Sequence, residues 1–184
     1  MSKYKCVKQH DITDCGAACI ATICLYYKKE VAITKLREMS GTDTKGTTIL
    51  GVVDALEKLG FEAKAIKITR EAFNEKFTLP CIVRVLTKEG LTHFIVINKI
   101  YKNHLSVSDP AKGLIKLKKE EFFEDFDGYA VLCAPTSDFV ADKSNSKNIF
   151  SRFSKLIFSQ KKLFIVAIIA SVILTILGIA SSFF

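Results

Sequence analysis

The sequence predicts an α+β fold, with helices packed on an antiparallel sheet, followed by a single transmembrane helix. Segments with helical spacing of apolar residues occupy the first part of the chain, whereas short strand-like runs fill residues 81–134. Helices followed by a group of strands are typical of α+β proteins. The segment 163–184 contains neither a charge nor a proline. With 184 residues, the chain is long enough for one domain with a complete hydrophobic core.

The helices are predicted from their capping residues and their periodicity. Asp14 can cap the first helix, and Ser40 and Gly41 close the second. Thr48 caps the third helix, whose apolar residues recur at helical spacing until Gly60. The predicted helices are 16–27, 34–39 and 48–60, with a shorter helical turn at 69–76.

Five later segments have the composition and length of β-strands. They begin at Cys81, His93, His104, Gly113 and Tyr129. A short helix beginning at Lys119 separates the last two of them. We therefore expect these strands to form the sheet of a domain that covers residues 1–135.

The segment 163–184 is predicted to be a transmembrane helix. As a helix it would be about 33 Å long, enough to cross a hydrocarbon core of about 30 Å. A buried helix of a soluble protein is the alternative, but few such helices are apolar on every face over this length. A signal peptide is excluded, because the segment lies at the C-terminal end of the sequence.

The positive charge of the chain is concentrated before this span. The formal net charge is +8, and the run from Lys143 to Lys162 contains several basic residues and no acidic one. Such a run beside a span marks the cytoplasmic side and favours anionic lipid. Its position favours this interpretation over nucleic-acid binding. We predict a linker at 136–148 and a basic amphipathic helix at 149–162 on the membrane surface, which places residues 1–135 on the cytoplasmic side.

The chain contains six cysteines, of which Cys15 lies at the start of the first predicted helix and Cys19 and Cys24 lie inside it. Disulfides are not expected in a reducing cytoplasm. Cys15 and Cys19 are four residues apart and could form half of a metal site. The chain lacks a second close cysteine pair. Small buried cysteines pack well in a core, so packing is favoured over metal binding for Cys19 and Cys24.

Cys15 lies at the start of a helix, where a thiol can become a nucleophile. The N-terminus of a helix favours an anion, and the thiolate is the reactive form of cysteine. A histidine could complete the activation. Of the three histidines, His10 is close to the thiol in sequence and His104 is in a predicted turn. His93 opens a strand and shares a face with Ile95 and Ile97, so it is either a core histidine or the partner of Cys15.

Asp109 is the candidate partner of His93, but the sequence leaves the strand register open. A hairpin centred on Tyr101 would bring Asp109 beside His93, where the carboxylate can hold the imidazole's tautomer and orientation. A two-residue turn at Lys102 and Asn103 would instead place Asp109 opposite Val96, on the other face of the sheet.

Gln9 lies six residues before Cys15 and is the candidate for an oxyanion donor. Its side-chain amide and the backbone N–H of Cys15 could both donate to a developing oxyanion. The alternative is an ordinary surface glutamine.

Together these residues resemble one known family. Gln9, Asp14-Cys15-Gly16, Ala18, His93 and Asp109-Pro110 match, in order and spacing, the bacteriocin-processing cysteine peptidases. These are papain-like domains at the N-terminus of peptidase-containing ABC transporters. The resemblance covers residues 1 to about 135 and continues through the linker and the first transmembrane helix.

The resemblance implies a function for the whole set. The family cleaves a leader peptide after a double-glycine-type site, and the transporter exports the released peptide. Cys15 would be the nucleophile, His93 the general base and acid, Asp109 the orienting group and Gln9 the oxyanion donor. A non-catalytic docking domain and a papain-like hydrolase with another acyl substrate remain alternatives.

The resemblance also implies partners and cofactors. The partners would be a precursor peptide, membrane lipid, the transporter's remaining transmembrane and ATPase domains, and a second copy in a homodimer, but not nucleic acid. The peptidase would need no cofactor or metal. ATP would bind only in the nucleotide-binding domain, which is expected outside this chain, since the sequence has no Gly-Lys-Ser/Thr phosphate loop. A leader helix is expected to bind in an apolar groove, with the loop 41–48 as a candidate rim.

Overall fold

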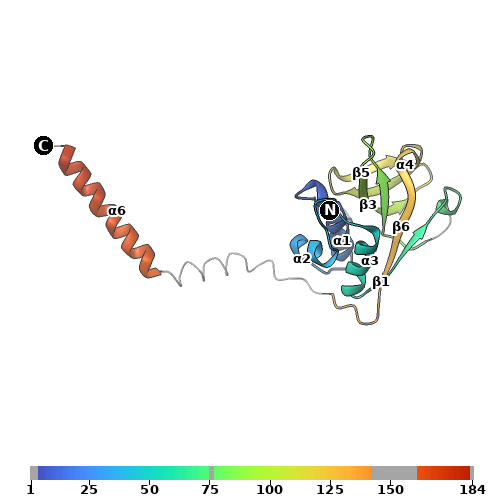
Figure 1. Cartoon of the computed structure of the whole chain (residues 1–184), viewed down its shortest axis with the longest axis horizontal. Helices are drawn as coiled ribbons and strands as arrows, with labels where there is room; N and C mark the ends of the chain where they lie inside the picture. Colours follow the sequence, from blue (N-terminus) through green and yellow to red (C-terminus); the bar gives the residue numbers. More distant parts are fainter. Residues whose placement is uncertain (1–3, 75–76, 142–160, 183–184) are drawn as a thin grey trace. The chain divides into compact units, whose positions relative to one another are not determined.

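The computed structural model describes residues 4–74, 77–141 and 161–182. The chain divides into two compact units, Met1–Ser144 and Asn145–Phe184. The first unit holds all the strands of the described residues, and the second holds one long helix (Figure 1).

The third helix begins where its capping residue predicts, whereas the side chain of Asp14 makes no capping hydrogen bond to the first helix. The hydroxyl of Thr48 accepts a hydrogen bond from the N–H of Gly51 at 3.0 Å and caps the third helix. The first helix is apolar on all sides and almost wholly buried, because the other helices and the sheet surround it. The helices are η1 (Ile12–Asp14), α1 (Cys15–Tyr26), α2 (Ile33–Met39), α3 (Ile49–Lys58), η2 (Ala72–Asn74) and α4 (Lys119–Asp125). The helical turn predicted at 69–76 is thus a single 3-10 turn in the described part of that segment.

The described residues form a six-stranded antiparallel sheet in the order β1-β6-β2-β3-β4-β5. The strands are β1 (Phe61–Lys67), β2 (Cys81–Leu86), β3 (Thr92–Ile100), β4 (His104–Asp109), β5 (Gly113–Lys118) and β6 (Phe126–Pro135). The five predicted strands are confirmed. Strand β1 was not predicted: it lies at the sheet edge, and most of its side chains are exposed.

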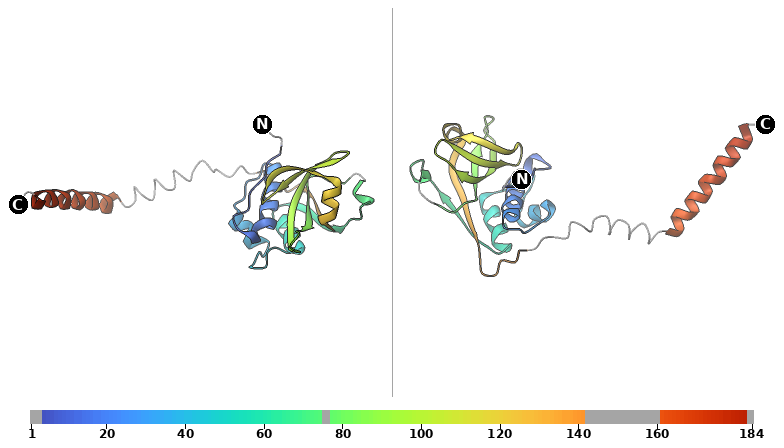
Figure 2. Two further views of the ribbon diagram at one scale, coloured as in Figure 1. Left: turned by 90° about the horizontal axis from the view of Figure 1, so that it is seen from above. Right: turned by 180° about the vertical axis from the view of Figure 1, so that it is seen from behind.

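Apolar cores form on both faces of the sheet. The helices α1, α2 and α3 cover one face, and α4 covers part of the other (Figure 2). Successive residues of β3 alternate between the two cores, as the geometry of a strand requires. Phe94 and Val96 pack with the helices, whereas Ile95 and Ile97 pack with Phe122 of α4. His93, at the start of β3, therefore lies on the face of Ile95 and Ile97, as the sequence predicts.

The residues directly after β6 pack on the domain. The N–H of Thr136 donates to the carbonyl oxygen of Gly60 at 3.0 Å. The ring of Phe139 lies 4.7 Å from that of Phe61 and 6.2 Å from that of Tyr27, centroid to centroid. The first residues of the segment 136–148 thus extend the core of the domain.

The second unit contains α6 (Lys161–Ser182). Its segment Lys162–Ser181 has a mean hydropathy of 3.0, so by length and composition it could cross a membrane. None of this segment is buried. The predicted amphipathic helix at 149–162 lies almost entirely outside the described residues.

Candidate active site

Cys15 is the first residue of α1 and is positioned by the turn before it. The side chain of Asp11 accepts a hydrogen bond from the N–H of Ile12 at 2.7 Å, and Asp14 Oδ2 accepts one from the N–H of Asp11 at 3.2 Å. This reciprocal cap fixes the direction in which the chain enters α1. Cys15 is buried, with 5% of its surface exposed, and its sulfur lies at the positive end of a helix of 12 residues.

Gly16 follows Cys15 because a side chain would not fit there. An added Cβ would lie 2.6 Å from Cβ of Thr47 and 2.7 Å from its Oγ1. The loop 41–48 therefore packs directly against the turn that carries Cys15. This contact supports the expectation that the loop borders the site. Its role as a rim of the leader groove remains a prediction.

Asp14 carries a buried charge next to Cys15. It is 1% exposed, and its Oδ1 lies 3.2 Å from Nε of Arg37 in α2. This oxygen has no aligned hydrogen bond, so the contact is an ion pair only. An uncompensated carboxylate here would oppose a thiolate at Cys15. Arg37 offsets that effect, and no local pattern in the sequence identifies Arg37 as the partner.

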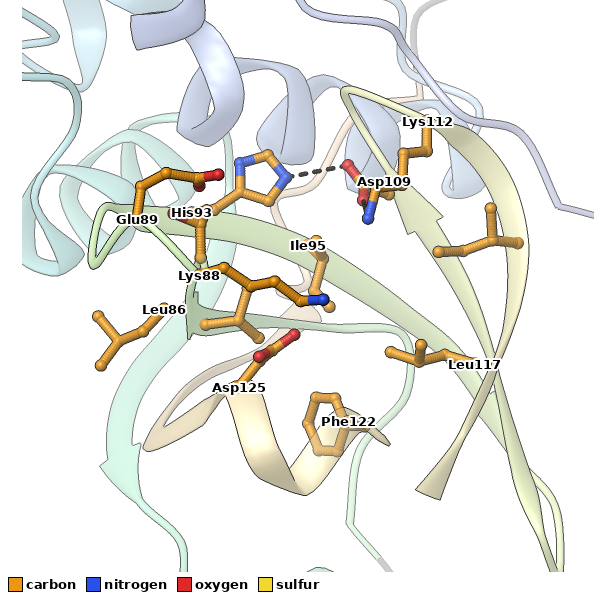
Figure 3. Close-up of a pocket in the computed structure, with 13 residues that line it drawn as sticks. Leu86, Lys88, Glu89, His93, Ile95, Asp109, Lys112, Leu117, Phe122 and Asp125 are labelled. Atoms are coloured by element: carbon orange, nitrogen blue, oxygen red, sulfur yellow. Dashed lines mark hydrogen bonds and ion pairs between the residues drawn. The ribbon is translucent and has the colours of Figure 1, made fainter. Parts of the chain in front are cut away.

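His93 and Asp109 meet at the same end of the sheet. His93 Nε2 lies 2.9 Å from Asp109 Oδ1, which also accepts a hydrogen bond from the N–H of Ala111 at 2.9 Å (Figure 3). Lys112 Nζ lies 4.0 Å from the other carboxylate oxygen. Asp109 is 4% exposed, so its carboxylate orients the ring in a largely dry environment.

The register that produces this contact differs from both registers considered from the sequence. The turn is the two-residue type, since the N–H of Tyr101 donates to the carbonyl oxygen of His104 at 2.9 Å. The hairpin centred on Tyr101 is therefore wrong. A shift of one residue between Ile97 and Lys99 then places Val96 opposite Ser108. Asp109, the next residue, consequently returns to the face of His93.

The electrostatics favour a charged imidazole. Burial lowers the pKa of His93, but hydrogen bonds to Asp109 and Cys15, and the negative charge of both groups, outweigh it and raise the pKa to about 9. For Asp109, burial raises the pKa of the carboxyl group. The hydrogen bonds from His93 and Ala111 and the charges of His93 and Lys112 outweigh this effect and bring the pKa below its usual value. Since Nε2 of His93 faces Asp109, Nδ1 remains for the thiol of Cys15.

Gln9 lies beside the end of β4. Its N–H donates to the carbonyl oxygen of Pro110, directly after Asp109, at 3.1 Å. The side-chain amide oxygen is buried without a hydrogen-bond partner. An amide rotated by 180° would place its NH₂ group at that position. The backbone contact brings Gln9 to the same sheet end as His93 and Asp109.

The remaining cysteines are thiols in the core or at its edge. Cys19, Cys24, Cys81 and Cys133 are buried, and none of the six cysteines is in a disulfide. Burial raises the pKa of Cys24 and of Cys133 to about 12. Within the described ranges, no group of three or more His, Cys, Asp or Glu side chains could hold a metal ion. The four buried thiols act as small packing groups.

A cavity of about 360 Å³ opens beside His93 and Asp109 (Figure 3). It is lined by apolar side chains, including those of Ile95, Leu117 and Phe122, and by charged side chains such as those of Lys88 and Lys112. A substrate bound across the site would therefore meet apolar surface next to the imidazole.

The model of the Peptidase C39 family matches residues 3–138, which include Cys15, His93, Asp109 and Gln9. The chain belongs to the peptidase C39 family. The match ends close to the last strand of the sheet, so it covers the folded domain.

Relatives of this C39 chain are processing transporters. It is 35% identical over 181 residues to the lactococcin-G-processing and transport ATP-binding protein LagD of Lactococcus lactis subsp. lactis, covering 98% of this chain and 24% of LagD. It is 32% identical over 179 residues to the transport/processing ATP-binding protein ComA of Streptococcus pneumoniae, covering 96% of this chain and 25% of ComA. The chain therefore spans about a quarter of the length of these relatives.

Solved structures of C39 domains share the fold. The peptidase domain of Streptococcus ComA has a TM-score of 0.69 and 38% identity, covering 72% of this chain and 99% of that domain. A double-glycine-motif protease from a peptidase-containing transporter, solved in complex with a leader peptide, has a TM-score of 0.66 and 32% identity. It covers 71% of this chain and 91% of that protease. The predicted fold class is confirmed.

Proposed function

We propose that this chain is a cysteine endopeptidase that removes the leader from bacteriocin or peptide precursors after a double-glycine-type site. Cleavage would be coupled to export by an ABC transporter. The proposal rests chiefly on one observation: His93 lies 2.9 Å from Asp109, and both Asp109 and the thiol of Cys15, at the start of α1, raise its pKa. Membership of the peptidase C39 family and the processing relatives support it.

The chemistry follows from the charges at this site. Cys15 attacks the carbonyl carbon before the scissile bond as a thiolate, forming a carbon–sulfur bond. The imidazolium of His93 gives its proton to the leaving amine as the carbon–nitrogen bond breaks. Water then attacks the thioester carbon, and His93 takes a proton from the water. The carbon–sulfur bond breaks, the thiolate of Cys15 is restored, and the leader leaves with a new carboxylate.

The oxyanion would be held by two donors. The backbone N–H of Cys15 lies at the first residue of α1, and the Gln9 amide supplies the second donor when its NH₂ group faces the site. One donor of this kind is worth about 3 kcal/mol in the transition state. Asp109 holds the ring of His93 and stabilises its charged form.

The docking-domain alternative is disfavoured because the chain contains both Cys15 and His93, the proposed nucleophile and general base. A fluorogenic leader-peptide assay separates the three functions. The full chain in detergent should cleave a peptide with a double-glycine leader and leave a scrambled peptide and a simple amide intact. Binding without cleavage would favour the docking domain, and cleavage of the simple amide alone would favour another acyl substrate.

The setting of the peptidase is also a proposal. The helix α6 and the transporter relatives support a place in the bacterial membrane, with the domain on the cytoplasmic side. The basic run before α6 would bind anionic lipid. The relatives are ATP-binding transporters, so ATP would bind in the nucleotide-binding part of the full transporter. We further propose that the chain acts there as a homodimer.

Asp109→Asn should reduce cleavage by less than His93→Ala and should change its pH dependence. The variant keeps a hydrogen-bonding group but loses the charge that stabilises the imidazolium. Wild-type kcat/KM should fall as pH rises through about 9, where His93 loses its proton. The variant's decline should begin at lower pH. A kcat/KM profile from pH 5 to 10 measures this, and an unchanged upper limb would show that Asp109 does not set the charge of His93.

Deleting residues 149–184 should leave a folded and active peptidase. All four proposed catalytic residues lie before residue 110, β6 ends at Pro135, and Phe139 packs on the core. The fragment 1–148 should be monodisperse without detergent and cleave a leader peptide at the rate of the full chain. Aggregation would show that the deleted segment stabilises the domain. A folded but inactive fragment would show that the membrane part completes the substrate site.

A further inference from the structure

Asp109 reaches His93 only because β3 contains an extra residue. The turn pairs Ile100 with Leu105 and Lys99 with Ser106. Continued without change, this register would place Asp109 opposite Val96, whose side chain packs with the helices. Residues that lie opposite each other share a face of the sheet, so Asp109 would point away from His93. A one-residue slip has this effect in any strand.

The extra residue is Asn98, which lies between the shifted pairs Ile97–Val107 and Lys99–Ser106. It forms a β-bulge, a feature that often re-aims a side chain near an active site. Asn98 is only 6% exposed, although it carries an amide. A buried amide is costly unless it is hydrogen-bonded.

The amide of Asn98 spans the two strands. Its Nδ2 donates to Oγ of Ser108 at 2.8 Å, and Ser108 is the residue directly before Asp109. Oγ of Ser108 in turn donates to the carbonyl oxygen of Lys5 at 3.1 Å. Ser108 has no exposed surface. A short polar chain therefore joins the bulge, the strand of Asp109 and the N-terminal segment inside the core.

The N-terminal segment then ties this strand to the helix of Cys15. Beyond Lys5, the N–H of Val7 donates to Oγ1 of Thr22 in α1 at 3.0 Å. The N–H of Gln9 donates to the carbonyl oxygen of Pro110 at 3.1 Å. The N-terminal segment thus contacts both the strand of Asp109 and the helix of Cys15. Its hydrogen bond with Ser108 is one of these contacts.

We propose that Asn98 and Ser108 are positioning residues, which hold the bulge in β3 and thereby keep Asp109 on the face of His93. They act through Asp109 and touch no reacting atom. The role in catalysis rests on the proposed function, but the geometric part does not. A purely structural role, in which the pair only satisfies buried polar groups, would affect stability alone.

The direct test is an NMR titration of His93 in the full chain in detergent, with its signal identified by loss in His93→Gln. In wild type, the apparent pKa should be near 9. Asn98→Ala and Ser108→Ala should each lower it toward the ordinary histidine value of about 6.5. Val107→Ala is the matched control: it removes buried methyl groups from β4 and should lower Tm while the His93 pKa stays unchanged.

Kinetics supply the second readout. Asn98→Ala should lower kcat roughly 10- to 100-fold with little change in KM, as misplacement of a catalytic group does. Combined with Asp109→Asn, it should cost almost nothing more, because the two changes interrupt the same interaction. If Asn98→Ala does not fold, Ser108→Ala carries both tests.

An unchanged His93 pKa in a folded Asn98→Ala or Ser108→Ala chain would overturn the proposal, as would a loss of kcat additive with Asp109→Asn. If wild type shows no cleavage at all, the proposed function fails, whereas the titration still decides whether the pair positions Asp109.

Discussion

Cys15→Ala should abolish leader cleavage while the fold and leader binding remain. The substitution removes the sulfur that forms the thioester and little volume, and alanine is accepted at the first position of a helix. Cleavage should fall below detection. Cleavage of a double-glycine precursor, followed by chromatography, measures the loss, and a binding assay with the same precursor shows that the site is still formed.

Cys19→Ala is the matched control, because Cys19 lies one turn further along the same helix and is fully buried. It should keep most of the activity, at the cost of a small cavity. Cleavage that persists in Cys15→Ala would place the nucleophile elsewhere. Loss of activity together with release of a metal from Cys19→Ala would revive the metal interpretation of the cysteine pair.

His93→Ala should reduce kcat by about 100-fold or more, which is the usual contribution of general acid–base catalysis. The change removes the positively charged imidazole that favours the thiolate of Cys15. It also removes the acid that protonates the leaving amine. Steady-state cleavage at neutral pH measures it. His10→Ala is the control, since His10 is exposed, and it should behave as wild type. A His93→Ala chain with near wild-type kcat would contradict the proposed role.

The same variant should lose stability in a pH-dependent way. The raised pKa of His93 means that its pairing with Asp109 stabilises the fold fully below about pH 6.5 and that this contribution is lost as pH rises through about 9. His93→Ala should therefore show its largest decrease in Tm at pH 6 and a smaller one at pH 10.

The sequence predicts those elements whose signals are local. Thr48 caps α3 as expected, because a hydroxyl that accepts from the N–H three residues later needs no distant partner. The strands rich in Val and Ile are also confirmed, because their residue composition is itself a local signal. Strand β1 was missed because only Phe61 and Ala63 of its early residues are buried, and its pairing partner lies far away in β6.

The candidate site shows the same limit. Cys15, His93 and Asp109 can be selected from the sequence by their residue types, their helix and strand positions, and the family pattern. The strand register that joins the last two depends on the bulge at Asn98 and on contacts with Lys5, which no local pattern reveals. The charge compensation of Asp14 by Arg37 is equally non-local.

The most direct test of the proposed function is mass spectrometry of a natural-type precursor incubated with the full chain in detergent. The account predicts two products, a leader that ends in the double glycine with a free carboxylate and the mature peptide with a free amine, and it predicts neither with Cys15→Ala. An intact precursor that remains bound to folded wild-type chain, without either product, would contradict it and identify the domain as a docking module.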